Sequence, residues 1–169
     1  MRIAMIGAGY VGLVSGACLA DFGHEVTCID SDAEKIAALN RGEIPIYEPG
    51  LDQLVKDNVA AARVFFSTDL AAAVGNSDVV FIAVGTPPRR DDGHADLSYV
   101  YAVAREVAGA LNGFTVVATK STVPLGTGDE VERIIREINP AADVAVVSNP
   151  MMSAELRDGY LPSHQWEFL

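Results

Sequence analysis

Residues 3–13 read IAMIGAGYVGL, a short apolar run that meets three glycines, Gly7, Gly9 and Gly12. Their spacing, G-x-G-x-x-G, falls between a segment typical of a buried strand and a segment typical of a helix. In this setting the first glycine permits a tight turn, the second lets a pyrophosphate approach the backbone, and the third lets the helix pack against the strand. The start of the helix adds free N–H groups and the positive end of its dipole. The pattern therefore predicts a strand–turn–helix unit that binds a dinucleotide.

The second predicted strand ends at Asp30, eighteen residues after Gly12. A carboxylate at this place can accept hydrogen bonds from both hydroxyls of an adenosine ribose, although a helix cap or a solvated strand end is the alternative. The next residues are Ser31, which is expected to cap the following helix, and Asp32, and neither is an arginine. A 2′-phosphate would meet negative charge there, so the sequence favours NAD over NADP. Lys35 can reach the same ribose or a phosphate, but its spacing also fits a solvated helix lysine.

Apolar runs alternate with helical patterns along most of the chain. The runs are rich in Val, Ile and Ala, which predicts strands buried on both faces and therefore a parallel sheet. We expect an α/β fold with a doubly wound, Rossmann-type, six-stranded and mainly parallel sheet and helices on both faces. An α+β fold with some antiparallel pairing is the alternative. The predicted strands are residues 2–6, 25–29, 63–67, 78–84, 114–119 and 143–147.

Charge and composition limit the classes of partner. The chain has 12 Lys and Arg against 23 Asp and Glu, a net charge of −11, which argues against nucleic acid and anionic membrane as partners. No apolar run is long enough to span a membrane and no signal peptide is recognisable, so we expect a cytoplasmic protein. Cys18 and Cys28 lie in apolar segments, which fits a reducing compartment. His94 stands alone among loop acids, so we predict no metal site.

Three predicted strands end in small or hydroxyl-bearing residues. Ligands of open α/β sheets bind beyond the carboxyl ends of the strands, so we expect these ends to line the same crevice as the glycine turn. Their hydroxyls could then bond a nicotinamide ribose, a carboxamide or a substrate hydroxyl. Taken alone, each is more often a helix cap, but the repetition at three strand ends favours a shared site. The residues are Gly85, Thr86 and Pro87, then Lys120, Ser121 and Thr122, then Ser148 and Asn149.

Several longer motifs occur in a fixed order along residues 1–150. They are GAGYVGL at 7–13, CID at 28–30 with Lys35, YEPGL at 47–51, VGTPP at 84–88, ADLSYV at 95–100, KSTVPLGT at 120–127 and SNP at 148–150. In these motifs the chain resembles the UDP-glucose/GDP-mannose dehydrogenase family, and within it the UDP-glucose 6-dehydrogenases. The resemblance implies that residues 1–150 form the NAD-binding Rossmann domain. Residues 151–169 are expected to be an atypical tail, and the central helix and C-terminal UDP-binding domain of the family are absent.

The resemblance also implies an activity. Such enzymes oxidise the 6-hydroxymethyl group of UDP-glucose to a carboxylate, giving UDP-glucuronate with two NAD per sugar, and their nucleophilic cysteine lies in a later domain. By the match, Val11, Asp30 and Lys35 hold NAD, and Thr86 and Thr122 complete the site. Thr122 is also expected to position water or a substrate oxygen, as an auxiliary catalytic residue. The full expected NAD set is Gly7, Gly9, Tyr10, Val11, Gly12, Asp30, Lys35, Gly85, Thr86, Pro87, Ser121 and Thr122.

Two other functions stay open at this stage. The first is a related dehydrogenase that acts on GDP-mannose or on a UDP-N-acetyl-hexosamine, and the second is a non-catalytic NAD-binding module. We expect this chain by itself to bind NAD without turnover, because the nucleophile and the part that would bind a UDP-sugar are missing. Members of the family usually pair through the central helix, which is expected to be absent here. Association into homo-oligomers is therefore left open.

Overall fold

The computed structural model of the chain describes residues 1–89 and 94–150, and the expected tail at 151–169 lies outside these ranges. Strands and helices alternate in the order that the sequence predicts. The elements are β1 (Arg2–Ile6), α1 (Tyr10–Asp21), β2 (Glu25–Ile29), α2 (Ala33–Asn40), α3 (Leu51–Ala60), β3 (Val64–Ser67), α4 (Leu70–Gly75), β4 (Val79–Ile82), α5 (Ser98–Ala110), β5 (Thr115–Thr119), α6 (Thr127–Ile138) and β6 (Val144–Ser148).

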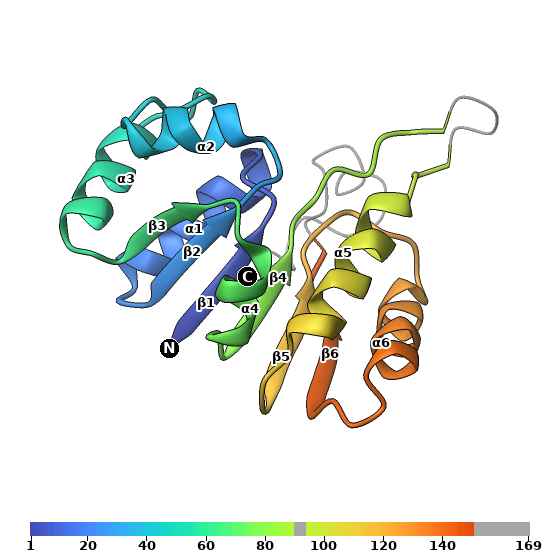
Figure 1. The fold of residues 1–169 in the computed structure, drawn as a ribbon. Coiled ribbons are helices and arrows are strands. Elements are labelled where there is room, and N and C mark those ends of the chain that lie inside the picture. The colour runs from blue at the N-terminus through green and yellow to red at the C-terminus, as the bar shows by residue number, and fades with distance from the viewer. Residues whose placement is uncertain (90–93, 151–169) are drawn as a thin grey trace, which may run out of the picture.

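The strands form one six-stranded sheet in the order β3-β2-β1-β4-β5-β6 (Figure 1). All five pairings between these strands are parallel, so the predicted doubly wound parallel sheet is confirmed. β1 lies in the middle, with Ile3 opposite Val26 of β2 on one side and Val79 of β4 on the other. The chain returns from the edge strand β3 to β4 beside β1, so the strand order reverses between β1 and β4. Ligands of such sheets bind at this reversal.

Two apolar layers enclose the sheet. Alternate residues of β1 point to opposite faces, so Ile3 and Met5 lie in one hydrophobic cluster and Ala4 and Ile6 in the other. Helices α1, α2 and α3 pack on the first face, and α4, α5 and α6 pack on the second. Helices on both faces are therefore confirmed. Representative buried residues are Leu13, Ile36 and Val55 on the first face, and Val74, Val107 and Ile135 on the second.

The connecting helices are short. The longest described helix, α5, has 13 residues, and α4 has only six. Within residues 1–89 and 94–150, no helix is both long and apolar enough to cross a membrane. Each helix packs buried residues against the sheet, only Val74 in α4 but four residues in α5.

One predicted helix cap is wrong. Ser31 was expected to cap the second helix, but the Asp32 side chain accepts hydrogen bonds from the N–H groups of Glu34 and Lys35, both at 3.0 Å. The cap moves by one residue because the Asp30 carboxylate accepts the N–H of Asp32 at 3.0 Å and extends the turn after β2.

The buried face of α6 gives a test of the packing. Ile135 is fully buried, whereas Ile138 on the same helix is 49% exposed. Ile135→Ala should lower the free energy of unfolding by about 2–5 kcal/mol, because it removes buried methyl groups and leaves a cavity. Ile138→Ala should change it by less than about 0.5 kcal/mol. Urea unfolding measures both variants, and equal losses would contradict the packing described.

Candidate functional site

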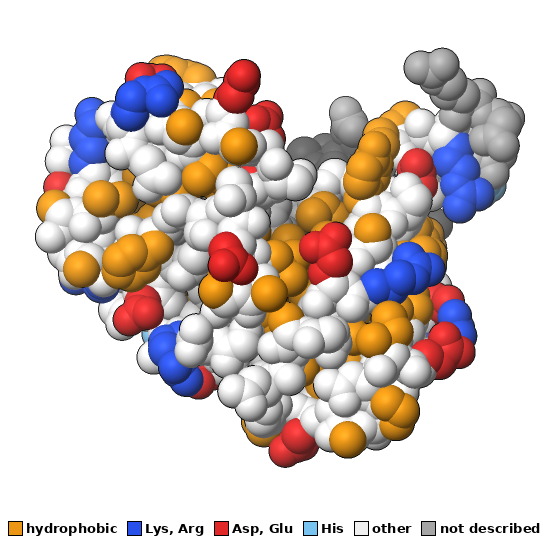
Figure 2. Space-filling model, in the orientation of Figure 1, with side chains coloured by type: hydrophobic (Ala, Val, Ile, Leu, Met, Phe, Trp, Pro, Cys, Tyr) orange, Lys and Arg blue, Asp and Glu red, His pale blue; other side chains and the backbone are white. Residues whose placement is uncertain are grey.

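A cavity of about 450 Å³ opens at the carboxyl ends of β1, β2 and β4, where the strand order reverses. Figure 2 shows this region as a hollow with hydrophobic side chains, beside α5. Residues from five segments of the chain meet here, although they are far apart in the sequence. Of the expected NAD-binding residues, the cavity brings together Gly7, Gly9, Asp30, Lys35, Gly85 and Pro87.

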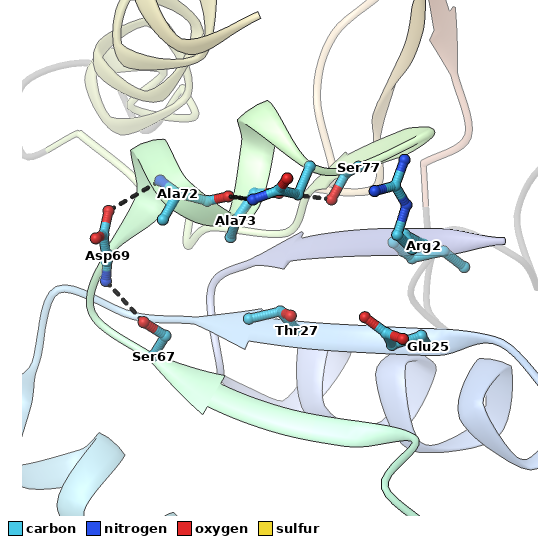
Figure 3. A pocket seen from close by; sticks show the side chains of 10 residues that line it. Arg2, Glu25, Thr27, Ser67, Asp69, Ala72, Ala73 and Ser77 are labelled. Carbon is cyan, nitrogen blue, oxygen red and sulfur yellow. Dashed lines mark hydrogen bonds between the residues drawn. The ribbon is translucent and has the colours of Figure 1, made fainter. Parts of the chain in front are cut away.

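A second hollow, of about 360 Å³, lies beside α4 over β1, β2 and β3 (Figure 3). Arg2 and Glu25 at one end of it begin their strands, so this end lies at the amino edge of the sheet. At the other end, Ser67 accepts the N–H of Asp69 at 2.9 Å, and Asp69 caps α4 through the N–H of Ala72. The polar groups beside α4 thus hold both ends of that helix, since Ser77 also donates to the carbonyl oxygen of Ala73 at its C-terminal end. The carboxyl-edge cavity remains the candidate functional site.

The glycines of the turn have unequal surroundings. Gly7 has a φ of 105°, and a Cβ on it would lie 2.5 Å from the carbonyl oxygen of Ala83. A Cβ on Gly12 would lie 1.8 Å from the Gly7 carbonyl oxygen. These two glycines therefore permit close backbone packing. A Cβ on Gly9 would meet no described atom within 4 Å, so the turn is open to the cavity at this residue.

Gly9 is also the N-cap of α1, and no side chain caps the N–H groups at the start of that helix. The first turn of a helix leaves such donors without intrahelical partners, and its dipole is positive there. An anionic group could therefore accept hydrogen bonds beside Gly9. The sequence suggested two conditions for pyrophosphate binding, namely open space at the backbone and free N–H donors. Both are found at Gly9.

Asp30 ties the end of β2 to the glycine turn. Its Oδ2 accepts the N–H of Ala8 at 3.0 Å and the Lys35 ammonium at 2.8 Å, while Oδ1 accepts the N–H of Asp32. Burial acts to raise the pKa of this carboxyl, but hydrogen bonds from Lys35, Asp32 and Ala8 outweigh it and hold the pKa below its usual value. Asp30 is therefore ionised at neutral pH. Its side chain keeps 13% exposure at the cavity, where it can accept further hydrogen bonds.

The hydroxyls expected to contact a ligand are partly used to join strand ends. Thr86 Oγ1 donates to the carbonyl oxygen of Thr122 at 3.0 Å. The buried Ser121 donates to the carbonyl oxygen of Val84 at 2.7 Å. Thr86 lies between the lining residues Gly85 and Pro87, so it adjoins the cavity. These contacts fix the ends of β4 and β5 relative to one another, and ligand binding by Thr86, Ser121 and Thr122 stays a prediction.

Tyr10, Val11 and Gly12 form the first turn of α1 and are not among the residues that line the cavity. The Tyr10 hydroxyl donates a hydrogen bond to the Glu48 carboxylate, and this bond raises the pKa of Tyr10. The contact joins α1 to the loop before α3. Sequence reasoning missed Glu48, although the YEPG motif that contains it was noted.

The sequence also missed one wall of the cavity. Helix α5 supplies Tyr99, Ala102, Val103 and Glu106, which are spaced i, i+3, i+4 and i+7 and so share one helix face. Thr68 and Leu70, at the start of α4, line the same space. The helical spacing was a usable signal. However, only the packing of α5 beside α4 shows that this stripe faces the site.

Comparisons with known proteins agree with this arrangement. The sequence profile of the UDP-glucose/GDP-mannose dehydrogenase family, NAD binding domain, matches residues 1–158. A UDP-glucose 6-dehydrogenase of Rhizobium meliloti (strain 1021) is 72% identical over 159 residues, which cover 94% of this chain and 36% of that protein. A UDP-glucose 6-dehydrogenase of Pseudomonas aeruginosa is 50% identical over 154 residues, covering 89% of this chain and 34% of that protein. The chain thus spans about a third of the length of these relatives.

Solved structures give the same result for the fold. A GDP-mannose dehydrogenase from Pseudomonas aeruginosa, in a ternary complex, superposes with a TM-score of 0.84 at 37% identity, covering 96% of this chain and 39% of that one. A UDP-glucose dehydrogenase from Pyrobaculum islandicum gives a TM-score of 0.84 at 37% identity, covering 95% and 39%. The similarity extends over nearly all of this chain, so the Rossmann-type assignment is confirmed.

The cavity fits the cofactor of the matched domain. NAD carries a pyrophosphate, an adenosine ribose with two free hydroxyls, and two flat rings. The open turn at Gly9 and the uncapped start of α1 suit the pyrophosphate, and the ionised Asp30 suits the ribose hydroxyls. The two positions belong to one cavity, as a single dinucleotide requires.

The glycine turn yields a paired prediction. Gly9→Ala should leave the unfolding temperature unchanged, because Gly9 has a φ of −83° and open space around it. Its methyl group should nevertheless weaken NAD binding by at least about tenfold, by keeping the pyrophosphate from the backbone. Gly12→Ala should instead lower stability by about 1–3 kcal/mol, because its Cβ would overlap the Gly7 carbonyl. Thermal unfolding and NAD titration of both variants separate these effects. Normal NAD binding by Gly9→Ala would refute this assignment.

The Asp30 contacts predict a pH dependence of stability. The pKa of this carboxyl is lower in the folded chain than in the unfolded chain, so its contribution is present above about pH 4. The contribution is lost as the pH falls through the lower, folded-state pKa. Asp30→Asn should therefore destabilise the chain at pH 7, and the difference from wild type should shrink near pH 3. Denaturant unfolding at several pH values measures this change. Asp143→Asn, which alters an exposed side chain, should show no such convergence.

Proposed function

The chain belongs to the UDP-glucose/GDP-mannose dehydrogenase family, matching its NAD-binding domain, and we propose that it forms the NAD site of an enzyme that oxidises UDP-glucose to UDP-glucuronate. Identity of 72% to a UDP-glucose 6-dehydrogenase, over nearly all of this chain, supports this choice of sugar nucleotide. Since the chain spans about a third of that relative, the proposal concerns the longer protein of which such a domain is part.

The observation that carries the proposal is the joining of Asp30 to the glycine turn. The same carboxylate accepts the N–H of Ala8 in the turn and the ammonium of Lys35. A ribose held by Asp30 thereby lies close to the pyrophosphate position at Gly9. Lys35 compensates part of the negative charge that Asp30 and the pyrophosphate would bring together.

The electrostatics favour NAD rather than NADP. Asp30 stays ionised at neutral pH, and Ser31 and Asp32 follow it without an arginine. The negative charge of a 2′-phosphate would be repelled by these carboxylates. Lys35 is already paired with Asp30 at 2.8 Å, so it offers little compensation. A free 2′-hydroxyl can instead donate to Asp30.

The proposed reaction removes two hydrides in succession from C6 of the sugar, one for each of two NAD molecules, while the accompanying protons leave from oxygen, and water supplies the second oxygen of the carboxylate. Bound NAD supplies the hydride acceptor. The ends of β4 and β5 are the proposed nicotinamide side, and they are held together by the Thr86–Thr122 contact. Thr122 is proposed to position water or a substrate oxygen there. The proposed compartment is the cytoplasm, where the free thiols of Cys18 and Cys28 stay reduced.

A GDP-mannose dehydrogenase is the alternative with a specific observation behind it. The solved structure of one such enzyme is as similar to this chain as that of a UDP-glucose dehydrogenase, with a TM-score of 0.84 and 37% identity in both comparisons. Kinetics of the longer protein with UDP-glucose and GDP-mannose would separate these substrates. Preference for GDP-mannose would overturn the proposed sugar and leave the NAD site intact.

Calorimetric titration of this chain tests the NAD site directly. We expect saturable binding of NAD and at least about tenfold weaker binding of NADP, because the 2′-phosphate meets Asp30. Asp30→Ala should weaken NAD binding and reduce the preference for NAD over NADP. Asp143→Ala, at an exposed position outside the cavity, serves as the matched control. A folded wild-type chain that binds no NAD would refute the proposal.

A further inference from the structure

Helix α5 presents a mixed surface to the cavity. Tyr99, Ala102, Val103 and Glu106 lie along one face of it and line the space together with Leu70 and Val84. Most of this wall is apolar. A flat nucleotide base can pack against such a wall, because burying the apolar faces of the ring away from water is favourable. Glu106 is the residue on this wall that carries a charge.

The distribution of charge within the cavity is uneven. Asp30 and Lys35 pair with one another at 2.8 Å at the ribose position. Glu106 is exposed, and no hydrogen bond or ion pair joins its side chain to another residue in the described ranges. The carboxylate of Glu106 is therefore available to a polar edge of a bound ring.

The positions of these residues suggest which part of the dinucleotide meets Glu106. Asp30 and Lys35 line the same cavity as this wall and, in the proposed function, fix the adenosine ribose. In that proposal the base attached to this ribose would lie against the apolar wall that includes Leu70 and Val103, because both line the same cavity. Tyr99 and Glu106 are separated by seven residues, about 10 Å along the helix. The wall is therefore long enough for its apolar residues to contact the face of a purine ring while Glu106 contacts one edge of that ring.

An ionised carboxylate only accepts hydrogen bonds. Adenine carries a 6-amino group, which donates, whereas hypoxanthine and guanine carry a 6-oxo group, whose lone pairs would face the carboxylate. We propose that Glu106 is a specificity-determining residue that accepts a hydrogen bond from the 6-amino group of the NAD adenine, and so selects adenine over 6-oxo purines. The inference rests on the proposed function, because it assumes that the cavity binds NAD.

The test compares NAD with nicotinamide hypoxanthine dinucleotide, which differs at the base by the 6-oxo group and the N1 proton. Calorimetric titration of the wild-type chain should show about tenfold tighter binding of NAD, a modest ratio because Glu106 is exposed to water. Glu106→Gln should reduce this ratio to about threefold or less. The amide can donate to the 6-oxo group and accept from the 6-amino group, so most of the change should be tighter binding of the hypoxanthine analogue.

Glu25→Gln is the matched control, because it removes the same charge from an exposed position outside the cavity. It should leave the ratio at the wild-type value, and thermal unfolding should show that both variants are folded. An unchanged ratio in Glu106→Gln, or a wild-type chain that binds both dinucleotides equally, would overturn the role of Glu106 while the NAD site stands. A folded wild-type chain that binds neither dinucleotide would refute the proposed function and this inference together.

Discussion

The close contact between the start of α1 and the end of β1 determines the rest of the site. Gly12 lies so near the Gly7 carbonyl that a methyl group does not fit between them. The contact places the uncapped end of α1 at the carboxyl edge of the central strand. There the partial positive charge of the helix faces the cavity instead of the hydrophobic core. Because β1 pairs with both β2 and β4, the turn also has a neighbouring strand end on each side.

Asp30 connects this turn with the second strand. Its three hydrogen bonds hold an ionised carboxylate at the cavity, and the ammonium of Lys35 offsets its charge. The same contacts stabilise the fold above the pKa of the carboxyl and prepare an acceptor for a ribose. One side chain thus serves both the fold and the proposed binding of the ribose. The polar groups around α4 differ, because their hydrogen bonds serve only the ends of that helix.

The ends of β4 and β5 also combine structural hydrogen bonds with a proposed role in ligand binding. Ser121 uses its hydroxyl to reach the carbonyl oxygen of Val84, and Thr86 reaches the carbonyl oxygen of Thr122. A hydroxyl can donate only one hydrogen bond but can still accept, so these side chains keep part of their capacity for a ligand. Tyr10 similarly holds Glu48 and its loop. Residues of a binding motif therefore also secure the loops that surround the site.

The sequence alone determined the strand order along the chain, the parallel sheet class and the glycine turn, because hydrophobic periodicity and glycine spacing are local properties. It also indicated Asp30, whose place after the second strand follows from the motif. It misplaced a cap at Ser31, because the choice of Asp32 depends on where the Asp30 carboxylate lies. Only the tertiary structure decided that Glu106 and Leu70 share a cavity with Asp30. Segments distant in sequence meet there through the packing of α4 and α5 on the sheet, and no local pattern encodes which helix faces meet.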